Sequence, residues 1–518
     1  MQKHIKRRSR QPIDAPNLAP LLCRVYGARG VTSERELEHN LAALAPPDLK
    51  GITEAVSLLT DAVVADARVL IVGDFDADGA TSSALAVLAL KAMGLKQVDF
   101  LVPNRFEYGY GLTPEIVAVA AEFEPDLIVT VDNGISSIDG VAAAQALGIA
   151  VLITDHHLPG AELPAAEAMV NPNQPGCTFP SKNLAGVGVI FYVMNALRRE
   201  LSQIGWFAES GIAEPNMAQF LDLVALGTVA DVVPLDHNNR ILVAQGLKRI
   251  RARVTRPGIL ALLEVAGRAP ERLVAGDLGF TVGPRLNAAG RLDDMSIGIR
   301  CLLTDDESEA RILASELDGF NRDRKAIESG MQREALAMLE KIGLSETDAL
   351  PWGLCLYDAN WHQGVIGILA SRIKDRLHRP VIVFADSDEH TIKGSARSIP
   401  GLHIRDALDA VAAHYPAILQ KFGGHAMAAG MSIKREDYTA FAEAFDAEVR
   451  RQLNDDDLQA VILSDGELTA DEFTLPLAQS LRDAGPWGQH FTEPTFDGEF
   501  FVVQQRLVGE KHLKLVLS

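Results

Sequence analysis

Short β-rich runs alternate with Ala- and Leu-rich helical stretches between Arg68 and about Asp236. The first such unit is LIV at 70–72, followed by ATSSALAVLALKAM at 80–93 and VDFLV at 98–102. Apolar, β-branched runs that alternate with helical patterns of about 10–15 residues are typical of βαβ units. The pattern therefore predicts an α/β fold built on a parallel sheet.

Three more regions follow along the chain. Residues 307–341 have few helix-breaking residues and carry apolar side chains at helical spacing, which predicts one long linking helix. A second, smaller α/β region runs to about Leu453, with strand candidates GLCLY and PVIVFAD, and the acidic run at 454–457 indicates a boundary. The last 25 or so residues are typical of a β-meander. The predicted parts are an N-terminal segment (1–50), a first α/β domain (51–303), the linking helix (304–345), a second α/β domain (346–453) and a β domain (454–518).

Acidic or imidazole side chains follow four of the apolar runs, in the stretches GDFDADG, VDNG, TDHH and VADVV. We expect each of these runs to be a strand. In open α/β sheets the ligand site lies at the carboxyl ends of the strands, so the polar side chains should converge there. The candidates are Asp74, Asp76, Asp78, Asp132, His156, His157 and Asp231.

Crowded carboxylates repel one another unless they share a proton or a cation. Aspartate with histidine and without cysteine suits Mg²⁺ or Mn²⁺ better than zinc. Taken singly, each stretch has a plainer interpretation: GDFDADG as a solvated turn or helix N-cap, VDNG as a turn, the histidines as a structural pair, and Asp231 as an N-cap or turn. The coincidence of four such stretches favours a metal site.

Composition narrows the class of protein. The chain has 518 residues, of which 47% are hydrophobic, and a formal net charge of −20. This charge argues against a surface that binds polyanions everywhere, but it leaves room for a local basic channel. The four cysteines form no CxxC pair, which disfavours a disulfide framework and a structural zinc site. No apolar run is long enough to span a membrane, and the basic start lacks the apolar segment of a secretory signal, so we expect a cytoplasmic protein.

The four stretches, in this order, resemble the DHH phosphoesterases. Within that superfamily they are most similar to the RecJ family of single-strand exonucleases, because further motifs match over residues 68–430. These motifs are PNRFEYGYGL, LAGVGVIFYVMNAL, GFTVGPRLNAAGRL, WHQGVIGILASRI, GSARSI and FGGHAMAAG. The resemblance implies a DHH catalytic domain, a DHHA1 substrate-binding domain, and the start of an oligonucleotide-binding (OB) barrel that is incomplete if the natural chain ends at Ser518.

The resemblance also implies a phosphodiesterase that uses two divalent cations, Mn²⁺ or Mg²⁺. Asp132 would bridge the two ions, Asp76 and Asp78 would serve one each, and His156 with Asp231 would complete the shell. We assign His157 to the phosphate or leaving group, since adjacent side chains rarely face the same ion. Many DHH enzymes have a histidine at the place of Val72. Asp74 is the candidate replacement ligand. The alternative is that Asp74 does not touch the ion but holds Asp76 or a water molecule in place.

Further residues are candidates for holding the substrate. Ser395 and Arg397 would grip a 5′ phosphate, although a strand-end salt bridge is the alternative for the arginine. Gly423, Gly424 and His425 would form a Gly-rich turn that approaches a nucleotide closely. Either packing or base stacking fits Trp361 and His362. Substrate-path and structural roles stay open for Arg105, Arg285, Asn287 and Arg291.

The resulting expectation is a 5′→3′ exonuclease that hydrolyses single-stranded DNA to nucleoside 5′-monophosphates, in DNA repair and recombination. Expected partners are a single-strand-binding protein and a helicase, with no membrane, and the chain is expected to act as a monomer. Two alternatives remain: a DHH phosphodiesterase of small substrates, such as oligoribonucleotides or cyclic dinucleotides, and a non-catalytic replication scaffold of the same fold.

Overall fold

The computed structural model describes residues 3–103, 111–341, 350–509 and 512–518. The chain forms two compact units. The larger unit comprises residues 38–458 and 486–491, and the smaller one comprises residues 1–37, 459–485 and 492–518. The expected domain limits at 50, 303 and 345 fall inside or beside the larger unit and stay predictions.

The larger unit contains a five-stranded parallel sheet with the order β3-β2-β4-β5-β6. Gly73 pairs with Val131, and Val131 pairs with Thr154, so three neighbouring strands end in register. Asp74, Asp132 and Asp155 therefore leave the sheet at one edge. The strands are Val69–Gly73 (β2), Val98–Leu101 (β3), Leu127–Val131 (β4), Ala150–Thr154 (β5) and Ala168–Val170 (β6).

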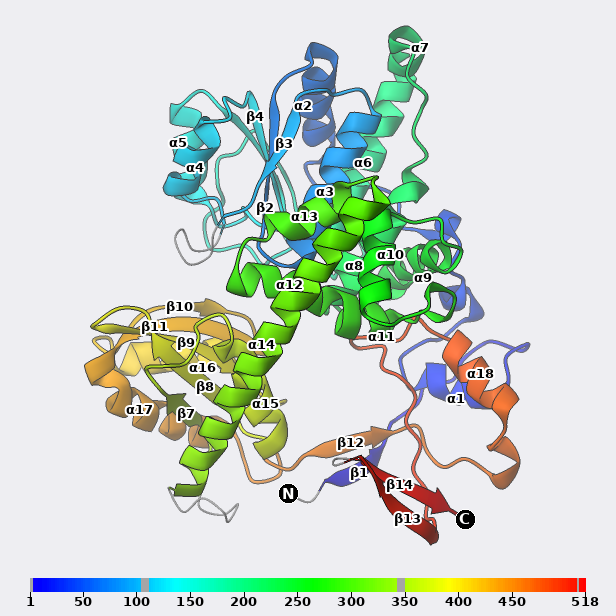
Figure 1. The fold of residues 1–518 in the computed structure, drawn as a ribbon, viewed down its shortest axis with the longest axis vertical. Coiled ribbons are helices and arrows are strands. Elements are labelled where there is room, and N and C mark those ends of the chain that lie inside the picture. The colour runs from blue at the N-terminus through cyan, green and yellow to red at the C-terminus, as the bar shows by residue number, and fades with distance from the viewer. Residues whose placement is uncertain (1–2, 104–110, 342–349, 510–511) are drawn as a thin grey trace. The chain divides into compact units, whose positions relative to one another are not determined.

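Helices cover both faces of this sheet (Figure 1). Strands β2 and β4 are buried along their whole length, and β5 is buried in all but its first residue, because both faces are covered; this explains their continuous apolar runs. Helices α4 and α5 pack together on one face, whereas α2, α3 and α6 pack together on the other. Their bounds are Ile52–Ala65 (α2), Ala77–Ala92 (α3), Pro114–Ala121 (α4), Ile138–Ala146 (α5) and Gly186–Gln203 (α6).

One expected strand is wrong. The run that ends before Asp231 is the helix α8, Leu221–Ala230, and Asp231 is its C-cap. The helix is buried on nearly all sides, so it lacks the polar face that would have distinguished it from a buried strand. Beyond β6 this part of the chain is helical: Trp206–Ser210 (α7), His237–Arg251 (α9), Pro257–Val265 (α10), Ala275–Asp277 (α11), the π-helix Leu278–Val282, Gly283–Leu292 (α12) and Ser296–Leu303 (α13).

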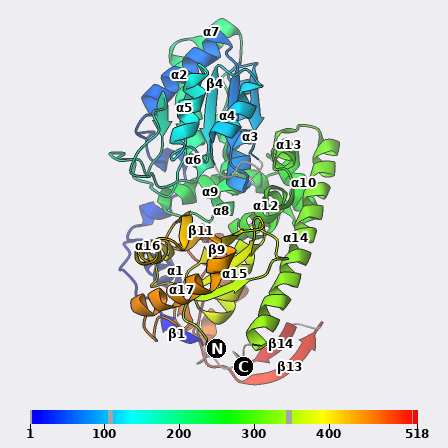
Figure 2. The ribbon, with the colours of Figure 1, turned by 90° about the vertical axis from the view of Figure 1, so that its left-hand side faces the viewer.

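The expected linking helix is confirmed as α14, Glu307–Lys341. Its first half packs on α10, α12 and α13, and its second half packs on α15 beside the second sheet (Figure 2). That sheet has the order β10-β11-β9-β8-β7, with only β7 and β8 parallel. Its elements are Leu354–Tyr357 (β7), Ile366–Leu377 (α15), Val381–Asp386 (β8), Thr391–Arg397 (β9), Ile404–His414 (α16), Leu419–Gly424 (β10), Ala428–Lys434 (β11) and Tyr438–Gln452 (α17).

The smaller unit joins residues from both halves of the chain. Strand β1 pairs in parallel with β12, with His4 opposite Val461, and Arg29 forms a buried ion pair of 2.8 Å with Asp465. The expected C-terminal β structure is the antiparallel hairpin β13–β14. The elements are His4–Arg7 (β1), Pro20–Gly27 (α1), Val461–Ser464 (β12), Leu475–Asp483 (α18), Val502–Val508 (β13) and His512–Leu517 (β14). Among the described residues, the helices are all too short or too polar to span a bilayer.

Candidate metal centre

The GDFDADG stretch, residues 73–79, which we call the acid loop, connects β2 to the first turn of α3. Asp76 is the N-cap of α3, and its Oδ1 accepts hydrogen bonds from the backbone N–H groups of Asp78 (2.8 Å) and Gly79 (3.1 Å). The capping interpretation of this loop therefore holds for Asp76. Because both bonds reach a single oxygen, capping and cation binding are compatible at this residue.

Asp78 is fully buried and faces the N-terminus of α6. Its carboxylate accepts hydrogen bonds from the N–H groups of Gly186 (2.6 Å) and Val187 (3.0 Å). The positive end of the α6 dipole stabilises the charge of Asp78. A Cβ on Gly186 would lie 2.6 Å from Cβ of Asp132, so only glycine lets the helix approach both acids.

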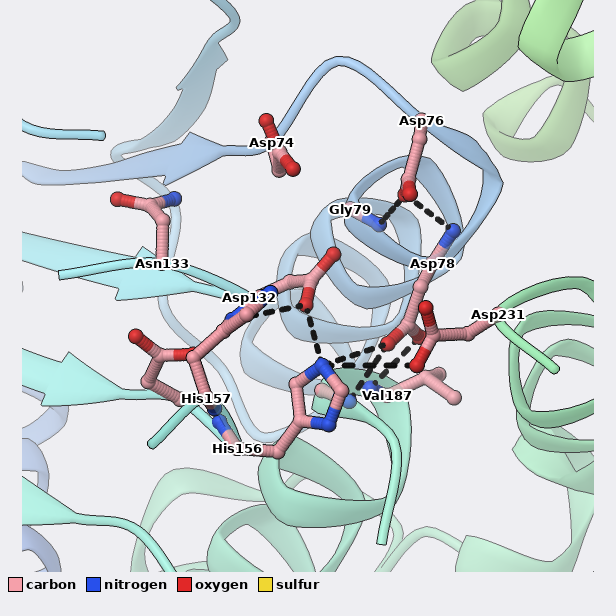
Figure 3. Close-up of polar contacts among 12 residues, drawn as sticks. Asp74, Asp76, Asp78, Gly79, Asp132, Asn133, His156, His157, Val187 and Asp231 are labelled. Carbon is pink, nitrogen blue, oxygen red and sulfur yellow. Dashed lines mark hydrogen bonds and ion pairs between the residues drawn. The ribbon is translucent and has the colours of Figure 1, made fainter. Parts of the chain in front are cut away.

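His156 lies among three carboxylates (Figure 3). Its Nε2 is 3.1 Å from Oδ1 of Asp132, 3.5 Å from Oδ2 of Asp231 and 4.0 Å from Oδ2 of Asp78. The three acids come from the ends of β4, α8 and the acid loop, so the predicted convergence is observed even though Asp231 follows a helix. Asp132 itself has a φ of 62°, a left-handed conformation that non-glycine residues seldom adopt.

The second histidine is held by the aspartate that precedes the pair. Nδ1 of His157 is 2.8 Å from Oδ1 of Asp155, and Oδ2 of Asp155 accepts the N–H of Ile135. Burial alone would lower the pKa of His157, but the hydrogen bond and charge of Asp155 raise it to about 9. Burial would likewise raise the pKa of Asp155, whereas the hydrogen bond and charge of His157 lower it.

The carboxylates of the centre resist ionising together. Burial, the charge of Asp231 and that of Asp76 raise the pKa of Asp78 to about 7. Burial and the charge of Asp76 raise the pKa of Asp231 to about 8, and burial with four neighbouring aspartates raises the pKa of Asp132 well above its usual value. These buried acids need compensating positive charge to be ionised at the same time.

The donor set fits divalent cations. Three overlapping groups each place their ligand atoms within 4.8 Å of one another: Asp74 with Asp76 and Asp132, Asp78 with His156 and Asp231, and Asp132 with His156 and His157. Nε2 of His156 is buried and makes no hydrogen bond among the described residues. Oxygen donors with imidazole suit Mn²⁺ and Mg²⁺.

One expectation changes at this centre and another is supported. Because the rings of His156 and His157 both place a ligand atom near Asp132, adjacency is no reason to exclude His157 from the metal shell. Val72 is buried in the core against α4 and α5, whereas Asp74 belongs to one of the three ligand groups. Asp74 therefore has the position that its proposed role as a ligand requires.

In the second sheet, Ser395 and Arg397 lie together on β9. Nη1 of Arg397 donates to Oγ of Ser395 (3.1 Å) and to the carbonyl of Ala396, and the arginine forms no ion pair within the described part of the chain. The salt-bridge alternative is therefore not observed among the described residues. Burial without an acidic neighbour lowers the pKa of Arg397. A Cβ on Gly367, in the first turn of α15, would lie 2.9 Å from both side chains, so a helix N-terminus also faces them.

The candidates of the GFTVGPRLNAAGRL motif have partners within the protein. Arg285 forms an ion pair of 2.9 Å with Asp318 of α14. The side chain of Asn287 accepts the N–H of Ala77 (2.7 Å) and so supports the acid loop. Arg291 donates to the carbonyl of Gly364 (3.2 Å). These contacts favour the structural alternative for the three residues. Arg105 lies outside the described residues.

The remaining candidates divide. Trp361 is buried in the core between α14 and the second sheet, and its Nε1 donates to Glu334, so packing is correct and base stacking is wrong. His362 accepts the N–H of Gly364. Gly423 and Gly424 end β10 and do not form the turn itself. His425, in the hairpin turn that follows, stacks on His157 with 6.1 Å between ring centroids.

Sequence reasoning missed several supporting residues. Asn133 donates to the carbonyls of Val72 and Val131 and so ties the ends of β2 and β4 together. Asp155 lies in TDHH and Gly186 in LAGVGVIFYVMNAL, but the sequence does not show which residues they face. Contacts across about 100 residues, such as Gly186 with Asp78, leave no local signal.

Comparisons with known proteins agree with this geometry. The family models "DHH family, N-terminal domain", "DHHA1 domain" and "RecJ OB domain" match residues 68–228, 352–451 and 464–518. A single-stranded-DNA-specific exonuclease RecJ of Dickeya dadantii is 59% identical over 99% of this chain and 89% of its own length. The chain belongs to the RecJ family.

Solved structures of RecJ proteins share this fold. RecJ from Thermus thermophilus in complex with Mn²⁺ has 30% identity and a TM-score of 0.81, with 100% of this chain and 72% of that chain covered. The Mg²⁺ complex from the same organism has 29% identity and a TM-score of 0.75, with 100% and 71% covered. RecJ proteins therefore bind both cations that the donor set of this chain fits.

Proposed function

We propose that this chain is a metal-dependent 5′→3′ exonuclease that hydrolyses single-stranded DNA to nucleoside 5′-monophosphates, in DNA repair and recombination. The observation that carries the proposal is the largely buried centre of five aspartates and His156 at the sheet edge. Its occurrence in a chain 59% identical to a single-stranded-DNA-specific exonuclease supports the substrate class.

The centre is proposed to hold two divalent cations, Mn²⁺ or Mg²⁺. Asp132 belongs to two of the three ligand groups, which supports its role as the bridging ligand. Asp74 and Asp76 would complete one site, and Asp78, His156 and Asp231 the other. When bound, such a pair of ions activates a water molecule and stabilises the charge on the attacking and leaving oxygens.

The protein's own groups have separate tasks in this proposal. Asp76 and Asp78 are held by backbone N–H groups, so their oxygens are fixed before a cation arrives. His157, oriented by Asp155, would contact the scissile phosphate or the leaving 3′ oxygen. The hairpin turn at His425 stacks on His157 and would bring the second α/β region against the same nucleotide.

The polarity of the reaction is proposed to come from Ser395 and Arg397. A half-buried guanidinium that has no acidic partner among the described residues, beside a hydroxyl and a helix N-terminus, is suited to a doubly charged terminal phosphate. A 5′-phosphorylated end held there would place the first phosphodiester near the cations. Gly423 and Gly424 would let the backbone of β10 lie close to the strand. Arg105 keeps its proposed role on the substrate path.

The remaining proposals concern context. We propose a cytoplasmic monomer that receives single strands from a single-strand-binding protein and a helicase. Residues 51–303 would form the catalytic domain, 346–453 the DHHA1 domain, and 454–518 part of an OB barrel. The matches of family models to 68–228, 352–451 and 464–518 support these assignments.

The test is digestion of 5′-labelled and 3′-labelled 5′-phosphorylated oligonucleotides with Mn²⁺, in single-stranded and duplex form. We expect the 5′ label to be released first, as mononucleotide, and the duplex to resist. Release from the 3′ end first, or equal attack on duplex, would contradict the proposal. Faster hydrolysis of dinucleotides than of long strands would favour the small-substrate alternative. Absence of Mn²⁺ binding would favour the scaffold alternative.

A further inference from the structure

The GFTVGPRLNAAGRL motif contains one solvent-exposed side chain on a segment that packs against α8, the helix that ends at Asp231. Phe280 is 89% exposed, whereas Leu278 and Val282, at either end of the same π-helix, are fully buried. Phe280 forms no ring contact among the described residues. Exposing an entire aromatic ring forfeits the free energy that its burial would provide, so its position calls for an occupant.

The motif packs against the elements that carry the metal ligands. A Cβ built on Gly279 would lie 3.1 Å from Val229, and one on Gly283 would lie 2.9 Å from Ala230. Ala230 is the residue before Asp231. Further along the motif, α12 lies beside α8 and Asn287 bonds to the first turn of α3 (Figure 1). The backbone that presents Phe280 is therefore in direct contact with the frame of the centre.

Two other exposed apolar side chains immediately follow residues of the centre. Val232 comes directly after Asp231, is 60% exposed and has a φ of 62°, which is unusual for a β-branched residue. Leu158 comes directly after His157 and is 56% exposed. Aliphatic and aromatic side chains offer nothing to a phosphate, but they suit the face of an unstacked base.

We propose that Phe280 is the stacking platform for a base of the single strand at the metal centre, with Val232 as an apolar contact beside it. The proposal rests on the proposed single-strand substrate and deepens it. A base must leave its duplex partner to stack on a protein ring, so this contact adds selection for single strands. Because every base has a π face, the contact is tolerant of sequence.

The first experiment compares Phe280→Ala, Phe280→Trp and the control Phe123→Ala in steady-state hydrolysis of 5′-phosphorylated oligonucleotides. Phe123 is also an exposed phenylalanine, but it precedes β4 and so lies toward the opposite edge of the sheet. We expect Phe280→Ala to raise KM about tenfold, the effect of one stacked base. Phe280→Trp should stay near wild type, and so should the control.

An abasic site separates stacking from a structural role. Placed at each position from the 5′ end in turn, it should raise the KM of the wild type about tenfold at one position and should not raise that of Phe280→Ala further. Effects that multiply at every position would overturn the proposal. Equal losses in Phe280→Ala and Phe280→Trp, or no loss in either, would also overturn it.

A binding measurement keeps this proposal distinct from the proposed function. With Ca²⁺ in place of Mn²⁺, a strand carrying 2-aminopurine at the identified position, or at each position in turn, should lose fluorescence on binding the wild type but not Phe280→Ala. Equal quenching by both proteins overturns the stacking role, whether or not hydrolysis is seen. Failure of the wild type to hydrolyse single strands, with quenching that depends on Phe280, would instead contradict the exonuclease function.

Discussion

The metal centre and the Ser395–Arg397 strand are incomplete in opposite ways. The metal centre crowds carboxylates whose pKa values are raised by burial and by the charge of neighbouring aspartates. Arg397 is a half-buried guanidinium whose pKa is lowered by burial, with no ion-pair partner among the described residues. Each region is therefore suited to a ligand of opposite charge, and the proposed substrate, a cation-bound phosphodiester with a terminal phosphate, would supply both. An excess of one charge in a buried region thus indicates that its ligand carries the opposite charge.

The largest expected effect concerns the acidic region, the metal centre. Asp132→Ala should lower turnover about a thousandfold or more, because the proposed bridging ligand of the cations is lost. Without metal, thermal unfolding should occur at the same or a higher temperature, since a buried carboxylate beside Asp78 is removed. Mn²⁺ titration calorimetry and circular dichroism check both. The exposed Asp61→Ala is the control, and retained activity in Asp132→Ala would remove that residue from the bridging role.

The next effect tests the basic side. Arg397→Ala should lower the preference for a 5′-phosphorylated over a 5′-hydroxyl strand by about 10- to 100-fold in kcat/KM, the effect of one hydrogen bond to a charged group. Lys393→Ala, which removes an exposed cation from the same strand, should leave the ratio unchanged. A ratio that falls equally in both variants would show that only general positive charge matters.

A smaller effect concerns the support of the acid loop. Asn287→Ala leaves the N–H of Ala77 without its acceptor, and we expect Mn²⁺ affinity to fall about tenfold. Asn287→Asp keeps an acceptor at that place and should recover most of the affinity. Equal Mn²⁺ binding by the wild type and Asn287→Ala would show that the loop holds its shape without this bond.

The smallest effect lies far from either centre. Gly330 is inside α14, and a Cβ there would meet no atom within 4 Å, so Gly330→Ala should stabilise the protein by about 0.5–1 kcal/mol. Gly186→Ala should instead destabilise it and impair metal binding, because the new Cβ meets Asp132. Urea unfolding measures both changes. Stabilisation by Gly186→Ala would mean that α6 can move away from the centre at no cost.

The sequence predicts best what local pattern controls. The strands β2, β4 and β5, the helix α14 and the convergence of the acids follow from apolar runs and from a rule for parallel sheets. Asp231 shows the limit, because a helix buried all round and a buried strand have the same apolar pattern. Its place in the centre was still correct, since a polar residue after a buried run marks an element's end in either case.

What the sequence does not predict is which residues meet across the chain. Arg285 had the chemistry to bind phosphate, but its position on α12 places it against Asp318 of α14. Asn287 and Gly186 act on the acid loop from more than 100 residues away. Trp361 enters the core because α14 packs over it. Such contacts depend on tertiary packing, and a local sequence pattern carries no information about it.

The pairing of β1 with β12 determines when the smaller unit can fold while the chain is being synthesised. His4 finds its partner only when Val461 has been made, about 450 residues later. At roughly 5–20 residues per second, the wait is roughly 20 to 90 seconds. During that time the strand HIKR has no sheet to join, and Lys6 and Arg7 discourage its pairing with another nascent chain. The larger unit has most of its sequence available to fold first, and the smaller unit closes last.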